Sequence, residues 1–244
     1  DMMMHEQVRE DAGGAILFDA AVSPQVDGNW FAQAYWSERG ALRTESGGRG
    51  GVAIVDTSAG ECVLKHYRRG GMVAAVLGDR YLWTGAGRTR GFRELRLLDI
   101  IATIGLPGPR PVAARYERRG LFYTADLLTR RIDGAVTLAQ CIAQGRLDGE
   151  LSGAVGHLVA RFHRAGICHA DLNAHNVLIG PDGLHLIDFD RGEQRSLDSG
   201  WQQGNLRRLR RSLLKVGAAT QGEAAFEAAV WTPLRLQYER TLTS

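Results

Sequence analysis

The chain contains 244 residues, enough for one large or two small lobes with real cores, and its 44% hydrophobic content is ordinary for a soluble globular protein. The net charge of +3 is mild, and three cysteines without paired spacing argue against a disulfide framework and for a reducing compartment. No apolar run approaches the ~20 residues that span a bilayer, and the first residues lack the order of a secretory signal.

The first part of the chain has the pattern of strands joined by turns. Mixed apolar and aromatic positions predict an early strand over 14–22 and a short helix over 29–36. A glycine-rich turn at 47–51 leads into a strand over 52–55, and the chain returns through a hairpin loop as a strand over 62–67. These elements indicate a strand hairpin in this part of the chain.

A helix and two further strands complete this sheet-rich part. Helical spacing of apolar residues predicts a helix over 92–103, which a proline-rich loop at 107–111 ends. Strands follow over 112–116 and 121–128. The polar, glycine-containing segment 130–134 then predicts a hinge.

Beyond the hinge the pattern becomes mainly helical. Helices are expected over 137–144, 151–165, 204–216 and 222–240. The fold class is therefore α+β, with a β-rich lobe over residues 1–129 and a mainly helical lobe over residues 130–244.

The strongest chemical signal lies in two short runs of the second lobe. Residues 169–176 read His-x-Asp-x-x-x-x-Asn, and Asp188 follows on a hydrophobic run. Phosphoryl transfer from a nucleotide needs a carboxylate that orients the attacking hydroxyl, and an Asn with a second carboxylate that hold Mg²⁺. We therefore predict a bilobal protein-kinase-like phosphotransferase with Asp171 as catalytic base, Asn176 and Asp188 as Mg²⁺ ligands, and His169 as a brace for the loop.

An Asx-type loop cap is the structural alternative for Asp171. Asp190 is a further carboxylate nearby, and its role stays open.

The first lobe supplies candidates for binding the phosphates of ATP. Lys65 lies in mid-strand beside apolar residues, which is unusual unless the lysine has a purpose. In a kinase such a lysine contacts the α- and β-phosphates and pairs with a helix glutamate, for which Glu94 is the natural partner. An ordinary surface charge is the alternative for Glu94. Gly48 and Gly50 would let backbone N–H groups approach phosphates, although their turn lacks the third glycine of G-x-G-x-x-G.

Two arginine clusters suit an anionic partner, because the guanidinium fork matches phosphate oxygens. Arg68 and Arg69 follow the Lys65 strand directly and are candidates for contacting the acceptor. The basic residues at 207–211 would lie on the outer face of a helix, either as solvated surface or near the head groups of an anionic membrane.

The chain also resembles the Kdo kinases (3-deoxy-D-manno-octulosonic acid kinases) of the lipopolysaccharide core kinase family. The segments that carry the resemblance are residues 64–71, 79–83, 91–96, 105–111, 169–176, 186–192 and 201–215. The resemblance covers most of residues 30–216.

This resemblance implies transfer of the ATP γ-phosphate to the 4-hydroxyl of a Kdo sugar on a lipid A precursor, an anionic glycolipid. It implies Mg²⁺ and ATP as cofactors, no nucleic-acid partner, and a place at the cytoplasmic face of the inner membrane of a Gram-negative bacterium. Carried over by position, Asp171 is the base, Asn176 and Asp188 bind Mg²⁺, and Lys65 with Glu94 orders the phosphates.

Departures from protein kinases favour a non-protein acceptor. Ala170 stands where protein kinases have Arg, and Asp190 stands where Gly follows Asp-Phe. Only about a dozen residues separate Arg191 from the next predicted helix, which leaves little platform for a peptide. The alternatives are an aminoglycoside-type small-molecule kinase, a heptose kinase, or a lipopolysaccharide-binding pseudokinase.

Overall fold

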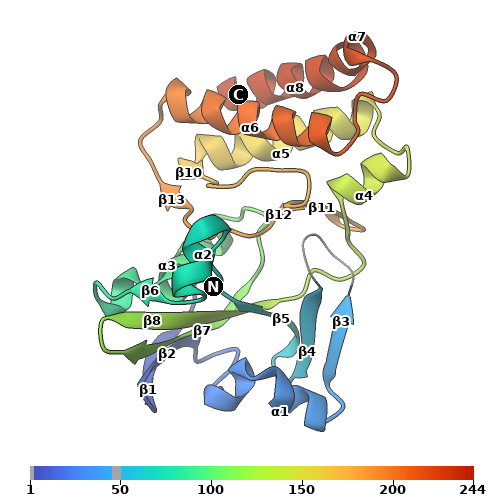
Figure 1. Cartoon of the computed structure of the whole chain (residues 1–244). Coiled ribbons are helices and arrows are strands. Elements are labelled where there is room, and N and C mark those ends of the chain that lie inside the picture. The colour runs from blue at the N-terminus through green and yellow to red at the C-terminus, as the bar shows by residue number, and fades with distance from the viewer. Residues whose placement is uncertain (1–2, 46–50) are drawn as a thin grey trace. The chain divides into compact units, whose positions relative to one another are not determined.

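The computed structural model describes residues 3–45 and 51–244 and divides into two compact units (Figure 1). The first unit comprises Asp1–Ile104 with Pro109–Arg131, and the second comprises Gly105–Gly108 with Ile132–Ser244. The assignment of residues 1–129 and 130–244 to two functional lobes stays a prediction.

The first unit is built on one antiparallel sheet. Its strands are β1 (Glu6–Asp11), β2 (Gly14–Asp19), β3 (Leu42–Glu45), β4 (Val52–Thr57), β5 (Gly60–His66), β6 (Tyr81–Leu82), β7 (Pro111–Arg119) and β8 (Phe122–Arg130). They lie in the order β1-β2-β7-β8-β5-β4-β3, and β6 pairs with β8. Its helices are α1 (Gln33–Glu38), α2 (Gly71–Leu77) and α3 (Arg90–Thr103), with 3₁₀ turns at Gly28–Phe31 and Ala86–Arg88.

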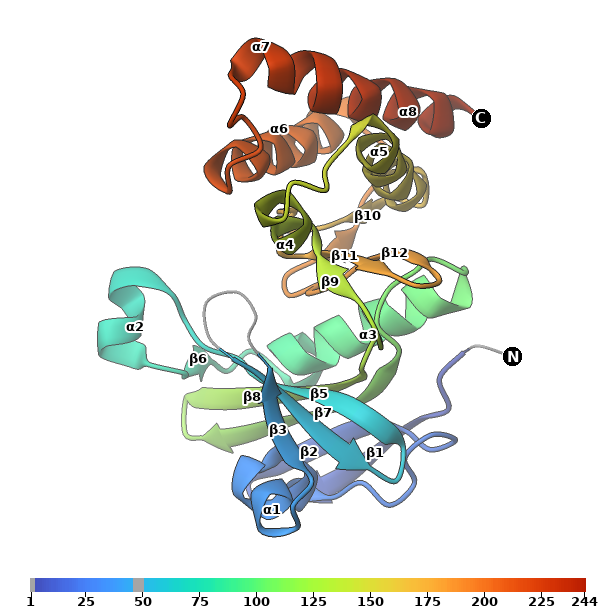
Figure 2. The ribbon, with the colours of Figure 1, turned by 90° about the vertical axis from the view of Figure 1, so that its right-hand side faces the viewer.

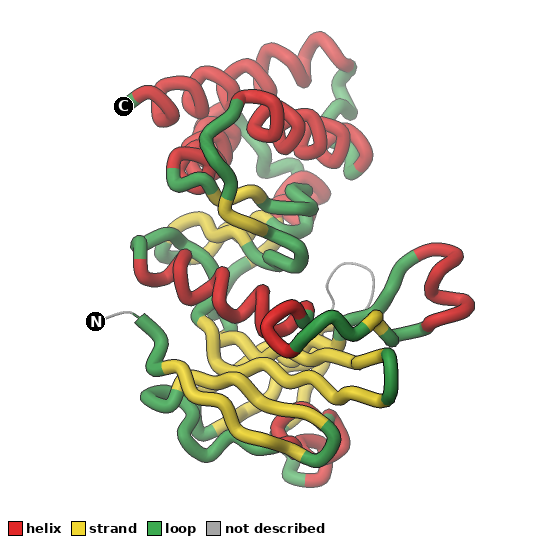
Figure 3. The backbone as a smooth tube through the Cα atoms, turned by 90° about the vertical axis from the view of Figure 1, so that its left-hand side faces the viewer, coloured by secondary structure: helices red, strands yellow, loops and turns green. Residues whose placement is uncertain are grey.

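Helices cover both faces of this sheet (Figures 2 and 3). Trp30 and Trp36 pack under one face with Phe18 and Leu128. On the other face α3 packs against β7 and β8. Gly91 allows that close approach, because a Cβ there would lie only 3.0 Å from the Asp126 carbonyl oxygen. The sheet and α3 together fix where β5 and α3 present their polar side chains.

The second unit is mainly helical. Its helices are α4 (Leu138–Ala143), α5 (Gly149–Arg164), α6 (Ser199–Lys215), α7 (Glu223–Phe226) and α8 (Thr232–Thr243), with a π-helical segment at Glu227–Trp231. Short strands form two small antiparallel sheets, β12-β11-β9 and β10-β13. These strands are β9 (Val136–Thr137), β10 (Ile167–Cys168), β11 (Val177–Gly180), β12 (Gly183–Leu186) and β13 (Glu193–Gln194).

The helices α5 and α8 pack directly against each other. Gly156 makes this possible, since a Cβ at that position would lie 2.1 Å from the Leu234 carbonyl oxygen. Across the described part of the chain, no helix combines the length and the apolar character needed to cross a membrane.

Several predicted boundaries were wrong for identifiable reasons. The helix expected over 204–216 begins at Ser199, because Asp198 caps it by accepting a hydrogen bond from the Gly200 N–H. Only residues 192–198 therefore separate Arg191 from this helix, fewer than expected. The single helix expected over 222–240 contains the π-helical segment, next to Pro233, which has no N–H for the regular i to i−4 bond.

Candidate active site

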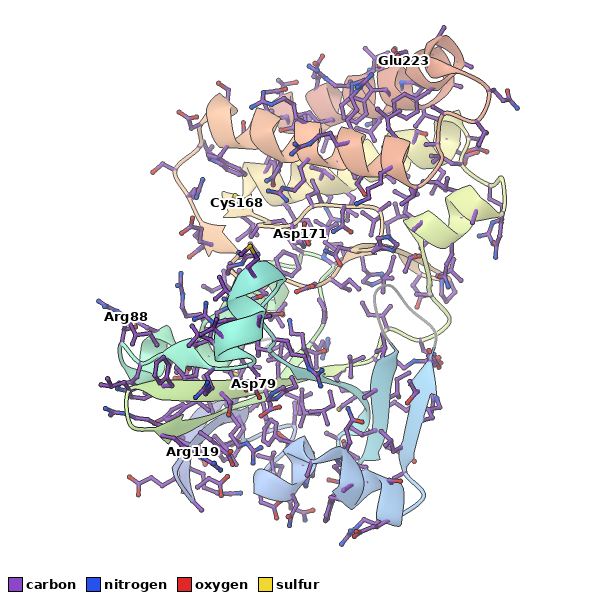
Figure 4. All side chains as sticks on the ribbon, in the orientation of Figure 1. Asp79, Arg88, Arg119, Cys168, Asp171 and Glu223 are labelled. Atoms are coloured by element: carbon purple, nitrogen blue, oxygen red, sulfur yellow. The ribbon has the colours of Figure 1, made fainter. Side chains whose placement is uncertain are left out.

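The loop of residues 169–176 is braced by His169. The backbone N–H of Asp171 donates to His169 Nδ1 over 3.0 Å, so Nδ1 is an acceptor and the imidazole is not doubly protonated. The opposite nitrogen, Nε2, then donates to the Ile187 carbonyl at 2.8 Å. His169 thus ties the loop that carries Asp171 to the segment that leads into Asp188, as the sequence predicts. Figure 4 labels Asp171 on this loop.

Asn176 is oriented by the same loop. Its Nδ2 donates to the Asp171 carbonyl at 2.9 Å, which turns Oδ1, the other polar atom of the planar amide, away from that carbonyl. Its carbonyl accepts from the Ile187 N–H at 3.0 Å, next to Asp188 in the chain. An amide oxygen and a carboxylate are the hard donors that Mg²⁺ prefers, so the chemistry of Asn176 and Asp188 fits that ion. Their role as ligands stays a prediction.

Asp188 is held in an uncommon backbone conformation. Its φ is +61°, in the left-handed region that non-glycine residues rarely adopt. The next residue, Phe189, is fully buried and stacks on Phe162 with ring centroids 5.5 Å apart, and it also contacts the His169 ring at 4.9 Å. Burial of Phe189 anchors the segment, and such strain is typical of functional positions.

One face of α6 supports the 169–176 loop. Asn205 Nδ2 donates to the His169 carbonyl at 3.0 Å, and Ser212 Oγ accepts from the Ala174 N–H at 2.9 Å. Between them, Arg208 Nη1 lies 3.4 Å from Asp171 Oδ1. Positions 205, 208 and 212 share one helix face because they are three and four residues apart. This face therefore fixes the loop backbone and sets a cation beside the candidate base.

A buried hydrogen-bond chain extends this support to α8. Because Asn205 Nδ2 is committed to His169, its Oδ1 faces His163 Nε2 at 3.1 Å and accepts from it. His163 Nδ1 then accepts from the Tyr238 hydroxyl at 2.7 Å. Burial lowers the pKa of His163 to about 4 and raises the pKa of Tyr238 to about 12, so both are neutral at physiological pH. This chain of hydrogen bonds therefore links α5, α6 and α8 to the 169–176 loop without a buried charge.

In the first unit the structure brings Lys65 and Glu94 together. Lys65 Nζ lies 2.6 Å from Glu94 Oε1, and the Tyr67 hydroxyl donates to the same oxygen at 2.8 Å. Glu94 is only 4% exposed, so it is not an ordinary surface charge. Tyr67 directly follows the last residue of β5, His66, and lies two positions after Lys65, so the two side chains leave the extended backbone on the same side and both reach α3. The role of the pair toward ATP stays a prediction.

The structure describes Arg68 and Arg69 among the remaining predicted site residues, but not the two glycines. Gly48 and Gly50 lie outside the described residues. Arg68 is exposed. Arg69 Nε donates to the Arg80 carbonyl at 2.7 Å, and its guanidinium lies over the Tyr81 ring at 4.6 Å, so part of its role is structural.

Sequence reasoning missed Tyr67, Asn205 and Ser212 around the site, and it placed Arg208 only within the outward-facing basic cluster at 207–211. For Tyr67 the available signal is its position two residues after Lys65 on a strand. For the three on α6 it is the spacing of polar residues at 205, 208 and 212, which the neighbouring arginines obscure. None of these contacts follows from the motifs themselves.

Comparison with solved structures shows which fold the chain has. The structure titled "WaaP in complex with acyl carrier protein" matches with a TM-score of 0.51 and 19% identity, over 85% of this chain and 81% of that chain. This likeness shows a protein-kinase-like fold, so the prediction of an α+β kinase-like chain is confirmed.

Comparison of sequences then gives the family. Residues 33–231 match the lipopolysaccharide kinase (Kdo/WaaP) family. The "3-deoxy-D-manno-octulosonic acid kinase" of Xanthomonas axonopodis pv. citri (strain 306) is 50% identical over 85% of this chain and 84% of that protein. A protein of the same name from Xylella fastidiosa (strain M12) is 46% identical over 88% of this chain and 84% of its own length. The chain belongs to the lipopolysaccharide kinase (Kdo/WaaP) family, and it is a phosphotransferase.

Proposed function

We propose that this enzyme transfers the γ-phosphate of ATP to the 4-hydroxyl of Kdo on a lipid A precursor. The observation that carries the choice of acceptor is the 50% identity, over 85% of the chain, to a protein named 3-deoxy-D-manno-octulosonic acid kinase. We further propose that it acts at the cytoplasmic face of the inner membrane, because its acceptor is anchored there.

The residues have distinct roles in this reaction. Asp171 accepts a hydrogen bond from the acceptor hydroxyl, whose oxygen attacks the γ-phosphorus as the bond to ADP breaks, and the hydroxyl proton passes to the carboxylate. Asn176 and Asp188 would hold Mg²⁺, which neutralises phosphate charge. Lys65, fixed by Glu94 at 2.6 Å, contacts the α- and β-phosphates.

The basic residues near these groups suit an anionic acceptor. Arg208 lies 3.4 Å from Asp171 and is half exposed, so it can contact a carboxylate or phosphate of the acceptor beside the reacting hydroxyl. Arg68, exposed after β5, is a second candidate.

The test is transfer of labelled γ-phosphate from ATP to Kdo–lipid IVA by wild type, Asp171→Ala and Asp182→Ala. Asp182 is an exposed carboxylate in the turn between β11 and β12 and serves as the matched control. We expect Asp171→Ala to lose about 10²–10⁴ in rate with an unchanged melting temperature, and Asp182→Ala to behave as wild type.

Near wild-type turnover of Asp171→Ala would remove Asp171 as the base. Phosphorylation of an aminoglycoside or a heptose acceptor, with none of Kdo–lipid IVA, would replace the acceptor. Failure to bind Mg·ATP would favour a lipopolysaccharide-binding pseudokinase.

A further inference from the structure

The helix α2 is apolar along its whole length but is not buried. It reads Gly-Met-Val-Ala-Ala-Val-Leu over residues 71–77, and none of these residues is buried. A helix without a polar face normally lies inside a protein core or in a membrane. Here Met72 is 91% exposed, Val76 76% and Val73 48%. Packing within the first unit therefore does not explain the composition of α2.

The segment that carries α2, residues 67–80, is closed at its base; we call it the α2 excursion. His66 Nε2 lies 2.7 Å from Asp79 Oδ2, and the Arg69 N–H donates to the Gly78 carbonyl at 3.4 Å. Figure 2 shows α2 standing away from the sheet, and Figure 4 labels Asp79, which lies in the turn after α2. These contacts hold the two ends of the excursion together and leave its tip free of packing.

Basic side chains flank the apolar tip. Arg68 is exposed on the way into α2. Arg80 is exposed on the way out, and its guanidinium donates to the Leu77 and Val76 carbonyls at the end of the helix. The acidic residue of the excursion, Asp79, is engaged by His66. The surface around the tip is thus positive, which complements an anionic partner.

We propose that the α2 excursion inserts Met72, Val73 and Val76 into the boundary between head groups and acyl chains of an anionic lipid bilayer. Arg68 and Arg80 contact lipid phosphates beside them, as basic residues do at the edge of an inserted apolar segment. The inference rests on the proposed function, which gives the enzyme a lipid-linked acceptor.

The shape of α2 favours a bilayer over a protein partner. A stable protein interface buries about 1,200–2,000 Å² in total and needs matching surfaces. Three side chains on a seven-residue helix form a small convex tip, far less than such an interface requires. A bilayer accepts a convex apolar tip without a complementary groove.

The test is sedimentation with vesicles of phosphatidylethanolamine and phosphatidylglycerol, in the absence of any acceptor. We compare wild type with the double variant Met72→Ser/Val76→Ser, and with Val8→Ser as the control, since Val8 is 56% exposed on β1. We expect the double variant to bind the vesicles at least about tenfold less than wild type, and Val8→Ser to bind them as wild type does. A further variant, Arg68→Glu, should weaken vesicle binding, most strongly at low salt.

Turnover on two acceptors separates this inference from the proposed function. The double variant should phosphorylate a deacylated, water-soluble Kdo acceptor at the wild-type rate and lose rate only on a vesicle-embedded acceptor. If no form phosphorylates either acceptor while vesicle binding still depends on α2, the proposed function fails and the insertion stands.

Three results would overturn the insertion. They are equal partitioning of the double variant and wild type, an equal loss in Val8→Ser, and a dimer that the double variant abolishes without any vesicle binding. The third would assign α2 to a second copy of the chain.

Discussion

The 169–176 loop and the α2 excursion are built on opposite physical principles. The loop is polar and is supported by two polar residues of α6, the buried Asn205 and the half-buried Ser212, which bond His169 and Ala174. The α2 excursion is apolar at its tip, and the bonds that tie it lie at its base, where His66 contacts Asp79 and Arg69 donates to the carbonyls of Gly78 and Arg80. The support of the loop thus places polar side chains in the protein interior, where apolar side chains are usual. The α2 excursion instead places apolar side chains at the surface, where polar side chains are usual.

This contrast indicates which interactions stabilise each region. A buried polar group is costly unless it is hydrogen-bonded, so a satisfied chain such as Tyr238–His163–Asn205 selects one loop conformation. Exposed apolar side chains such as Met72 gain nothing from water and gain free energy only when something covers them. The polar groups of the loop therefore find their hydrogen-bond partners within the protein, whereas the apolar side chains of α2 need a surface outside the protein to cover them.

The largest expected effect comes from separating α5 from α8 at Gly156. A methyl group there would meet the Leu234 carbonyl oxygen at 2.1 Å, so Gly156→Ala must push α8 away together with Tyr238. We expect a loss of about 3 kcal/mol in the free energy of unfolding, the upper range for overpacking, measured by urea denaturation.

Gly153→Ala is the matched control on the same helix. Its Cβ would have only ordinary contacts, the nearest at 3.8 Å to Gln237 Cβ. Because alanine favours helix over glycine, this variant should be neutral or up to about 1 kcal/mol more stable. Equal losses from both variants would contradict the close-contact explanation.

The next effect comes from breaking the hydrogen-bond chain at Asn205. In Asn205→Ala the His169 carbonyl loses its donor and His163 loses its acceptor, which costs about 1–3 kcal/mol. Because the loop backbone then shifts near Asp171, we expect kcat to fall about 10- to 100-fold with the KM for ATP unchanged.

Gln203→Ala controls for helix α6, since Gln203 is a neighbouring polar residue outside this chain of bonds. If Asn205→Ala lowered stability but left kcat at the wild-type value, Asn205 would serve packing rather than positioning of the loop.

Much of the fold was predictable from the sequence because its core elements carry clear periodicity. The strands and helices at 52–66, 90–103, 111–130 and 149–164 agree closely with the predictions. The strand β1 was missed because it is an exposed edge strand of polar residues, without alternation to detect. The helix α2 was missed because its apolar run follows two glycines and has no polar face, so no helical period appears.

The site was predictable only as far as its motifs reach. Spacing predicted Asp171, Asn176 and Asp188 as site residues and strand position predicted Lys65, and their roles stay predictions. The supporting contacts were not predictable, because Asn205 and Tyr238 reach His163 only after α5, α6 and α8 pack together. Long-range packing decides such contacts, and local sequence does not encode them.

A smaller effect is expected at Arg208, which the motifs did not identify. Its guanidinium lies beside Asp171 but both groups are about half exposed, so water screens their attraction. We expect Arg208→Ala to raise the KM for the anionic acceptor about five- to tenfold, with little change in melting temperature. Steady-state kinetics on Kdo–lipid IVA checks this. The adjacent exposed residue is the control: Arg207→Ala should change the KM less than twofold, and equal effects would reduce Arg208 to general surface charge.

The smallest expected effect concerns pH at the base of the α2 excursion. The hydrogen bonds that His66 donates to Asp126 and then to Asp79 raise its pKa above the ordinary 6.5. Asp126 also lies 3.4 Å from Arg115 of β7, and the charge of Arg68 helps to lower the pKa of Asp79, so the two carboxylates are balanced by two or three cations.

Because the folded pKa of His66 is raised, its stabilisation is fully present below pH 6.5 and is lost as pH rises through the folded value. At the acid end the lowered pKa of Asp79, due mainly to its bond with His66, preserves the contact down to below pH 3.8. We therefore expect the melting temperature of wild type to exceed that of His66→Gln by a few degrees near pH 5.5, and this difference to disappear by pH 9.

Scanning fluorimetry across this pH range measures the difference in melting temperature. Limited proteolysis at Arg69 and Arg80 reports whether the base of the excursion opens over the same range. A difference independent of pH would mean that His66 contributes by packing, and that its charge does not hold the excursion closed.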